Sequence, residues 1–239
     1  MAAETLARKQ ELAENVRAVR NRIAAATAAA HRPADSVQLL PVTKFHPASD
    51  IALLAELGIR DVAENREQEA RAKAEQLPQV RFHMIGQVQT KKANSVARWA
   101  HSVHSVDSIK LVDALSRGME LALERGDRED PSLECFVQLS LDGDTSRGGC
   151  TSHDADAVIY AIEQAPHLAF AGVMCVPPLA SDPDLAFAAA ADYVRRWQNQ
   201  LGRRLNFSAG MSGDMDQAIA NGSTLVRVGT AIMGPRPVG

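Results

Sequence analysis

Leu39-Leu40-Pro41-Val42-Thr43-Lys44, near the start of the chain, is a short apolar run that ends in a lysine. Leu225-Val226-Arg227-Val228-Gly229-Thr230-Ala231-Ile232, near the other end, is a second apolar run, and it passes through an arginine into a Gly-Thr turn. Runs of this length, bounded by polar residues, are typical of strands buried on both faces of a parallel sheet.

From the first of these segments to the second, short apolar runs alternate with helical stretches. The runs lie at 37–44, 60–64, 80–86, 102–106, 133–141, 167–176, 204–210 and 224–229. The helical stretches between them carry apolar residues at helical spacing, as in 108–123 and 184–201. Eight strands separated by helices, without hairpins, predict a closed (β/α)8 TIM-type barrel in the α/β class. A doubly wound open sheet is the competing arrangement, but its dinucleotide form needs a Gly-x-Gly-x-x-Gly turn that the sequence lacks.

The 239 residues suit one barrel, which needs about 250. We therefore expect a single domain over 1–239, with an extra N-terminal helix at about 4–30 and the barrel at about 37–235. Leu12, Val16, Val19 and Ile23 form the apolar stripe of that helix. Pro41 removes a hydrogen-bond donor from the first strand, so we expect a local irregularity there.

Composition excludes several classes of function. Net charge is −3 with no basic block, which gives no support to nucleic-acid binding. No apolar stretch approaches the ~20 residues of a membrane span, and no signal peptide is evident at the start. The three cysteines are odd in number and match no metal spacing. A soluble cytoplasmic protein with reduced thiols is expected.

In a barrel the working face is the carboxyl end of the strands, where Lys44 and Thr230 are predicted to lie. A lysine at a buried strand tip can form an imine with an aldehyde; the alternative is a lysine that has emerged into solvent. Ser212 and Gly229-Thr230 precede short helices, whose free N–H groups suit a phosphate; the alternative is ordinary helix capping. An aldehyde that also carries a phosphate suggests pyridoxal phosphate.

Other polar motifs are weak. The stretch 142–146 begins like a calcium loop but lacks the glycine and glutamate that should follow, so no metal is expected. His83, His101 and His104 lack ligand spacing, and we interpret them as satisfied core or surface histidines.

At these residues the chain resembles the pyridoxal phosphate homeostasis proteins, barrel proteins related to the N-terminal domain of alanine racemase. The resemblance covers nearly the whole chain and is specific because its pieces occur in order. The pieces are Val42-Thr43-Lys44 with Pro47, Glu64-Asn65 with Gln68-Glu69, 82–89 followed by Lys92, 104–108, 172–177, Gly210-Met211-Ser212 with Asp214, and 222–224 through Arg227-Val228-Gly229-Thr230 to Gly234.

The resemblance implies a pyridoxal 5′-phosphate Schiff base on Lys44. It also implies further cofactor-binding residues, namely Asn65 and Met211 at the ring, Ser212, Gly229 and Thr230 at the phosphate, Gly86 at a neighbouring strand tip, and Arg227 at either the ring nitrogen or the phosphate. The chain departs from the common pattern at Ala63, Arg66 and His46, where glycine, an aromatic residue and a second lysine are usual.

For function, the resemblance implies a carrier in intracellular cofactor homeostasis. Such a protein buffers pyridoxal phosphate and delivers it to apo enzymes without substrate turnover, and we expect a monomer. The alternative is an enzyme, either a racemase or decarboxylase relative or a Schiff-base phosphosugar aldolase. Catalysis needs a second acid or base opposite the ring, which racemases take from a separate β domain. The chain stops at Gly239, soon after the eighth strand, so no such domain is expected.

Overall fold

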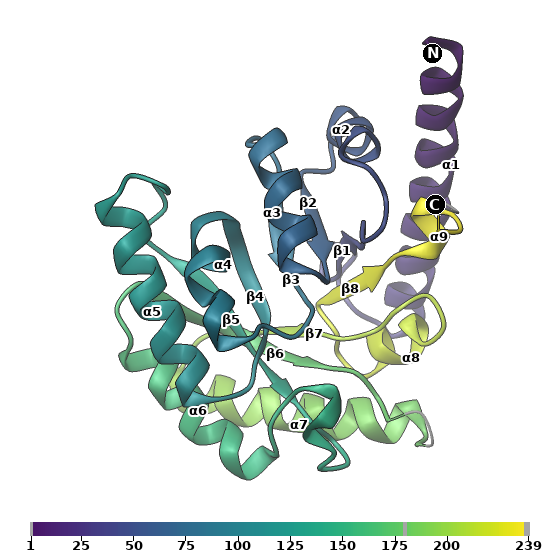
Figure 1. The fold of residues 1–239 in the computed structure, drawn as a ribbon. Helices are drawn as coiled ribbons and strands as arrows, with labels where there is room; N and C mark the ends of the chain where they lie inside the picture. Colours follow the sequence, from purple (N-terminus) through teal and green to yellow (C-terminus); the bar gives the residue numbers. More distant parts are fainter. Residues whose placement is uncertain (1, 179–180, 237–239) are drawn as a thin grey trace.

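A computed structural model describes residues 2–178 and 181–236. Within them, eight parallel strands form a sheet with helices outside it (Figure 1). The strands are β1 (Gln38–Pro41), β2 (Asp61–Glu64), β3 (Arg81–Met84), β4 (Ala100–Val106), β5 (Leu133–Leu139), β6 (Leu168–Cys175), β7 (Asn206–Ser208) and β8 (Leu225–Val228). The helices are α1 (Ala2–Ala29), α2 (Ala48–Glu56), α3 (Glu67–Gln76), α4 (Ala93–Trp99), α5 (Ile109–Glu124), α6 (Ser152–Gln164), α7 (Pro183–Leu201), α8 (Met215–Ala220) and α9 (Thr230–Met233), with 3₁₀ turns η1 (Thr90–Lys92) and η2 (Thr145–Arg147).

The strand order β1-β8-β7-β6-β5-β4-β3-β2 confirms the predicted barrel, since each strand pairs in parallel with its neighbours. The two end strands, β1 and β2, meet just beyond β1, where Val42 forms a parallel bridge with Ala63. There the Thr43 N–H donates to the Ala63 carbonyl at 3.0 Å. The ring of strands is therefore nearly closed.

Pro41 explains why the β1–β2 seam is so short. The backbone N–H groups of Gln38 and Val42 donate toward β8. The backbone nitrogens of the alternate residues of β1 therefore point toward β2. Pro41 is one of these alternate residues, and it has no N–H to donate to β2. The hydrogen bond between the two strands is instead donated by the N–H of Thr43. The predicted irregularity is confirmed, and it lies directly before Lys44.

The helices follow their sequence signals. Asp182 caps α7 by accepting from the Asp184 N–H, with Pro183 in the first turn, as its Asp-Pro pair predicts. The stripe of α1 is buried against the C-terminal part of the fold, where α8 and α9 lie beside it (Figure 1). Each large apolar side chain buried in this way contributes about 1.5–3 kcal/mol. The N-terminal helix thus covers the outside of one side of the barrel.

The described part of the chain contains no helix that is long and apolar enough to cross a membrane. Its three cysteines are free and buried, and burial raises the pKa of each thiol to about 12. These thiols therefore behave as core residues rather than nucleophiles.

Candidate functional site

A cavity of about 330 Å³ opens at the carboxyl ends of the strands. This volume lies within the range of small-molecule sites. Predicted residues from four separate segments line it, and these are Lys44, Asn65, Met211, Ser212, Arg227, Gly229 and Thr230. Val42, Ile85, Met174, Val176 and Gly213 complete the lining, and the predicted Gly86 does not contribute to it.

The backbone around Lys44 is held by side chains of α3. Lys73 Nζ donates to the Thr43 carbonyl at 3.0 Å, and Glu69 Oε1 accepts from the Phe45 N–H at 2.6 Å. These two groups belong to the peptide bonds on either side of Lys44. Phe45 has a φ of 68°, a left-handed conformation that a non-glycine residue holds only when its surroundings enforce it. The position from which Lys44 enters the cavity is therefore fixed, while its ammonium pairs with no other described residue.

Lys73 is the centre of a buried ionic cluster behind the site. It is 6% exposed and donates to Glu64 Oε1 at 2.6 Å and to Glu69 Oε1 at 2.7 Å. Glu64 is fully buried, and its Oε1 also accepts from the Thr43 hydroxyl. Burial raises the pKa of Glu64, and the nearby Lys73 ammonium opposes that rise. Glu64 Oε2 has no hydrogen-bond partner, so the cluster depends on Lys73 for its charge balance.

Sequence reasoning missed Lys73 entirely and gave Glu64 and Glu69 no role beyond their place in the family pattern. One signal was available. Glu69 and Lys73 are four residues apart, which places them on one face of a helix. The sequence does not show that this face packs against the turn at Lys44, because that depends on how α3 packs on the barrel.

Arg227 is a buried cation without an anionic partner. It is 4% exposed, its Nη1 donates to Ser208 Oγ at 2.8 Å, and its Nη2 donates to the Cys175 carbonyl at 3.0 Å. No carboxylate forms an ion pair with it among residues 2–178 and 181–236. Burial lowers its pKa. Because an uncompensated buried charge is costly, this arrangement favours a ligand that brings negative charge into the cavity.

The turns after β7 and β8 supply a polar wall of the cavity. Gly229 precedes the first turn of α9, and Thr230 is the first residue of that helix. Such a turn presents N–H groups that the helix itself cannot satisfy. On the other turn, Arg22 of α1 donates to the Ser212 carbonyl at 2.7 Å. The N-terminal helix thereby holds one edge of the cavity in place.

Asn65 and Met211 form part of the remaining wall, and Gly86 packs behind Asn65. Asn65 Oδ1 is buried without a hydrogen-bond partner, and the apolar Met211 side chain is 40% exposed at the cavity. Both features suit contact with a flat organic ring that also carries polar groups. Gly86 acts behind the wall, since a Cβ at this position would lie 2.1 Å from the Asn65 carbonyl oxygen. The absence of a side chain lets the tip of β3 approach the Asn65 backbone.

The three departures from the family pattern are accommodated around the site. Ala63 is fully buried inside the barrel and forms the bridge to Val42. Arg66 stacks over the Phe45 ring, with its guanidinium carbon 5.0 Å from the ring centroid. His46 is buried, and burial lowers its pKa. None of the three lines the cavity.

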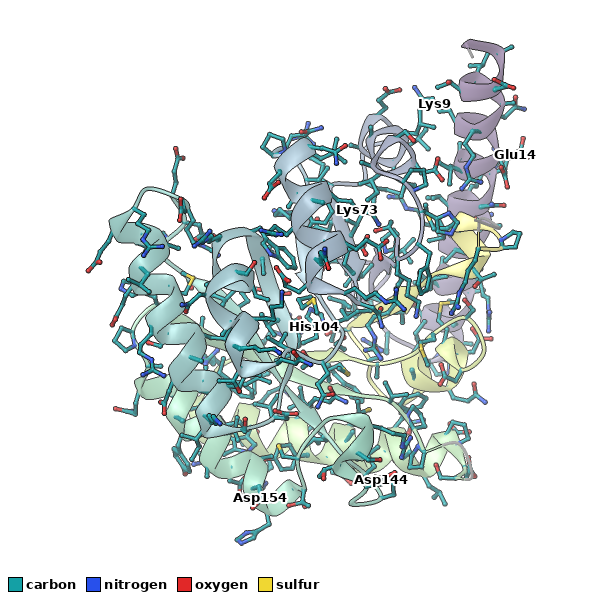
Figure 2. All side chains as sticks on the ribbon, in the orientation of Figure 1. Lys9, Glu14, Lys73, His104, Asp144 and Asp154 are labelled. Atoms are coloured by element: carbon teal, nitrogen blue, oxygen red, sulfur yellow. The ribbon has the colours of Figure 1, made fainter. Side chains whose placement is uncertain are left out.

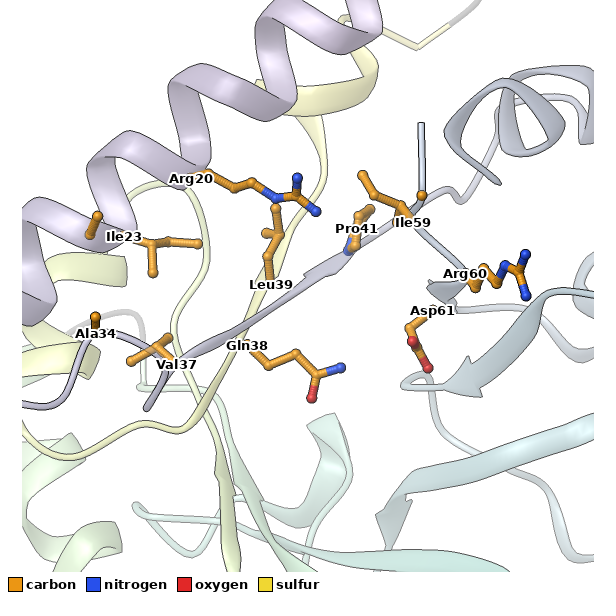
Figure 3. Close-up of a pocket in the computed structure, with 12 residues that line it drawn as sticks. Arg20, Ile23, Ala34, Val37, Gln38, Leu39, Pro41, Ile59, Arg60 and Asp61 are labelled. Atoms are coloured by element: carbon orange, nitrogen blue, oxygen red, sulfur yellow. The ribbon is translucent and has the colours of Figure 1, made fainter. Parts of the chain in front are cut away.

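A second cavity, also of about 330 Å³, lies between α1 and the amino ends of β1 and β2 (Figure 3). Arg20, Arg60 and Asp61 line it with apolar residues, and none of the predicted site residues reaches it. We place the candidate site at the carboxyl end, where barrels carry their ligands. Among the described residues, no group of histidine, cysteine and acidic side chains is arranged to hold a metal ion.

Comparison with known proteins gives consistent results. The family model described as alanine racemase, N-terminal domain, matches residues 9–237. The chain is 58% identical over 208 residues to the pyridoxal phosphate homeostasis protein of Corynebacterium glutamicum, covering 87% of this chain and 94% of that protein.

Two solved structures share the fold at 32% sequence identity. One is a protein from Bifidobacterium adolescentis, with a TM-score of 0.84 over 95% of this chain and 96% of that chain. The other is PipY of Synechococcus elongatus with pyridoxal phosphate bound, with a TM-score of 0.78 over 93% of this chain and 100% of that chain.

Proposed function

Because this chain belongs to the pyridoxal phosphate homeostasis proteins, within the alanine racemase N-terminal domain family, we propose that its carboxyl-end cavity binds pyridoxal 5′-phosphate as a Schiff base on Lys44. Its role is to buffer the cofactor in the cytoplasm and to deliver it to apo enzymes, without turning over a substrate. We further propose that a single-domain monomer carries out this role.

One observation carries the proposal. The cavity combines a lysine amine that pairs with no described residue and a buried arginine that lacks a carboxylate. A ligand with an aldehyde and a phosphate satisfies both groups together, whereas a simple anion leaves the amine without a role. The unpaired Asn65 Oδ1 and the exposed Met211 side chain suit the pyridine ring that joins the aldehyde to the phosphate.

The residues divide the work as follows. Lys44 supplies the amine, and the bound cofactor supplies an electrophilic aldehyde for it. Ser212, Gly229 and Thr230 hold the phosphate through hydroxyl and N–H groups. Arg227 supplies the positive charge that the ligand's anionic groups require.

The lining also supports storage rather than catalysis. Lys44 and Arg227 are the only ionisable groups among the described residues that line the cavity. Racemisation and decarboxylation by pyridoxal enzymes need a second acid or base at the opposite ring face. With Lys44 occupied by the cofactor, Arg227 is a poor proton donor or acceptor, because a guanidinium does not deprotonate near neutrality.

The test is a titration of the apo protein with pyridoxal 5′-phosphate, followed by the visible absorption of the Schiff base. Wild type and Lys110→Ala, which removes an exposed lysine of α5, should develop the band, and Lys44→Ala should not. Holo-protein mixed with an apo pyridoxal enzyme should restore that enzyme's activity. Steady turnover of any amino acid that Lys44→Ala abolishes would contradict the carrier role.

A further inference from the structure

A chain of buried polar side chains crosses the inside of the barrel from Arg227 to Asp61. Arg227 lies in β8 at the cavity, and Asp61 begins β2 at the opposite end of the barrel, where it lines the second cavity (Figure 3). The links are Arg227 Nη1–Ser208 Oγ at 2.8 Å, Ser208 Oγ–His104 Nδ1 at 3.0 Å, His104 Nε2–Ser102 Oγ at 2.9 Å, Ser102 Oγ–His83 Nδ1 at 2.7 Å and His83 Nε2–Asp61 Oδ1 at 3.0 Å. Figure 2 shows His104 in the middle of the fold.

With one proton on each imidazole, the two ends set the direction of every link. A guanidinium only donates hydrogen bonds, and an ionised carboxylate only accepts them. Asp61 also accepts two bonds from Arg81, at 2.7 and 2.5 Å, as an ionised carboxylate does. Ser208 therefore accepts from Arg227 and donates to His104 Nδ1, and Ser102 accepts from His104 Nε2–H and donates to His83 Nδ1. In this arrangement each imidazole carries a single proton, on Nε2.

The reversed arrangement satisfies fewer groups. If His104 carried its proton on Nδ1, both Arg227 and His104 would donate to Ser208 Oγ. The Ser208 proton would then face no acceptor in the chain. His104 is fully buried and stacks on Phe136 with ring centroids 4.0 Å apart, so no solvent offers a replacement partner.

We propose that His83, Ser102 and His104 are positioning residues for Arg227. The chain turns the Ser208 hydroxyl proton toward His104, so that the Ser208 oxygen accepts from Arg227 Nη1 without competition from a His104 N–H. The Cys175 carbonyl holds Nη2, and the remaining guanidinium N–H groups are free to meet the anion in the cavity. This inference rests on the proposed function only for the identity of that anion, pyridoxal 5′-phosphate.

The direct test is nitrogen NMR of the histidine side chains in the ligand-free wild-type protein. Replacements His83→Gln and His104→Gln assign the two signals among the seven histidines. We expect the Nε2–H tautomer at both positions. An Nδ1–H tautomer at either histidine, or a doubly protonated ring near neutral pH, would overturn the proposal whether or not the protein binds a cofactor.

Ser102→Ala tests the consequence at the site, because Ser102 contacts neither Arg227 nor the cavity. The variant should admit the Nδ1–H tautomer at His104 and bind pyridoxal 5′-phosphate about fivefold or more weakly, which corresponds to one hydrogen bond of about 1 kcal/mol. Ser116→Ala, which removes a buried hydroxyl bonded to the Pro166 carbonyl, should bind like wild type. Wild-type affinity in Ser102→Ala would refute the positioning role, whereas failure of wild type itself to bind would refute the proposed function and leave the tautomers to decide.

Discussion

Replacing Lys73 with methionine should destabilise the protein strongly, because the ammonium of Lys73 balances the charge of a fully buried carboxylate. Lys73 Nζ lies 2.6 Å from Glu64 Oε1 and 2.7 Å from Glu69 Oε1, and it also holds the Thr43 carbonyl. Methionine keeps the length and apolar stem of the side chain and removes the charge (Figure 2 labels Lys73 on α3). The change thus tests the charge of the ammonium together with its hydrogen bonds.

The magnitude follows from burial. Breaking a buried ion pair by removing one partner costs about 3–5 kcal/mol, since the other charge stays buried and uncompensated. Glu64 is fully buried and one of its oxygens already lacks a partner, so the full range applies. For a chain of this length the loss lowers Tm by roughly 6–20 °C. The exposed Lys110→Met on α5 should change stability by about 0.5 kcal/mol or less.

The loss should also depend on pH in a defined direction. Burial raises the pKa of Glu64, Lys73 opposes the rise, and removing Lys73 raises that pKa further. A group whose pKa is higher in the folded than in the unfolded state stabilises the fold below its unfolded pKa, and that contribution is lost as pH rises through the folded pKa. The deficit of Lys73→Met should therefore be larger at about pH 7.5 than at about pH 4.5.

Urea unfolding of both variants at the two pH values measures these quantities. Adding Glu64→Gln to Lys73→Met should reduce the loss to about 1–2 kcal/mol, because the neutral amide leaves no charge to desolvate. The reasoning is refuted if Lys73→Met and Lys110→Met unfold alike, or if the loss is the same at both pH values.

Three further outcomes are expected. Ser212→Ala or Thr230→Ala should weaken binding of pyridoxal 5′-phosphate by about 1–3 kcal/mol, and equal affinity of wild type for pyridoxal and its phosphate would show that these residues only cap helices. Gly86→Ala should destabilise by about 1–3 kcal/mol in thermal unfolding, because its Cβ would overlap the Asn65 carbonyl, whereas Gly58→Ala meets no atom and tests only the backbone strain of a positive φ. Glu69→Gln weakens the hydrogen bond that Glu69 accepts from the Phe45 N–H. The relative loss in the rate of Schiff-base formation should therefore exceed the relative loss in stability, and an unchanged rate would count against a role for this hydrogen bond.

The sequence alone predicted the eight strands because each apolar run is bounded by polar residues at helix starts and turns. The sequence also predicted Lys44 and Thr230 on one face, since all parallel strands of a barrel end on the same side. The structure places both residues in the lining of one cavity. Gly86 was assigned to the ligand because its strand tip lies at that face. In the structure this glycine packs against the Asn65 backbone and is not among the lining residues of the cavity, and its contact with a ligand stays a prediction.

The contacts that hold the site could not be predicted in this way. The partners of Lys73 depend on the packing angle of α3. The partners of His104 depend on the stagger of β4 against β7, which brings residues 104 and 208 together. The sequence predicted satisfied core or surface histidines, and the structure places His83 and His104 in the core. Spacing carries no information about a link across the barrel.

The central claim is that Lys44 forms the covalent link to the cofactor. Holo-protein can be reduced with borohydride, digested, and examined by mass spectrometry for the peptide that carries the added pyridoxyl phosphate. The account predicts the modification on Lys44 alone, and no covalent label in Lys44→Ala. A label on Lys73, Lys92 or any other lysine at wild-type yield, or a wild-type protein that binds the cofactor without any reducible link, would contradict it.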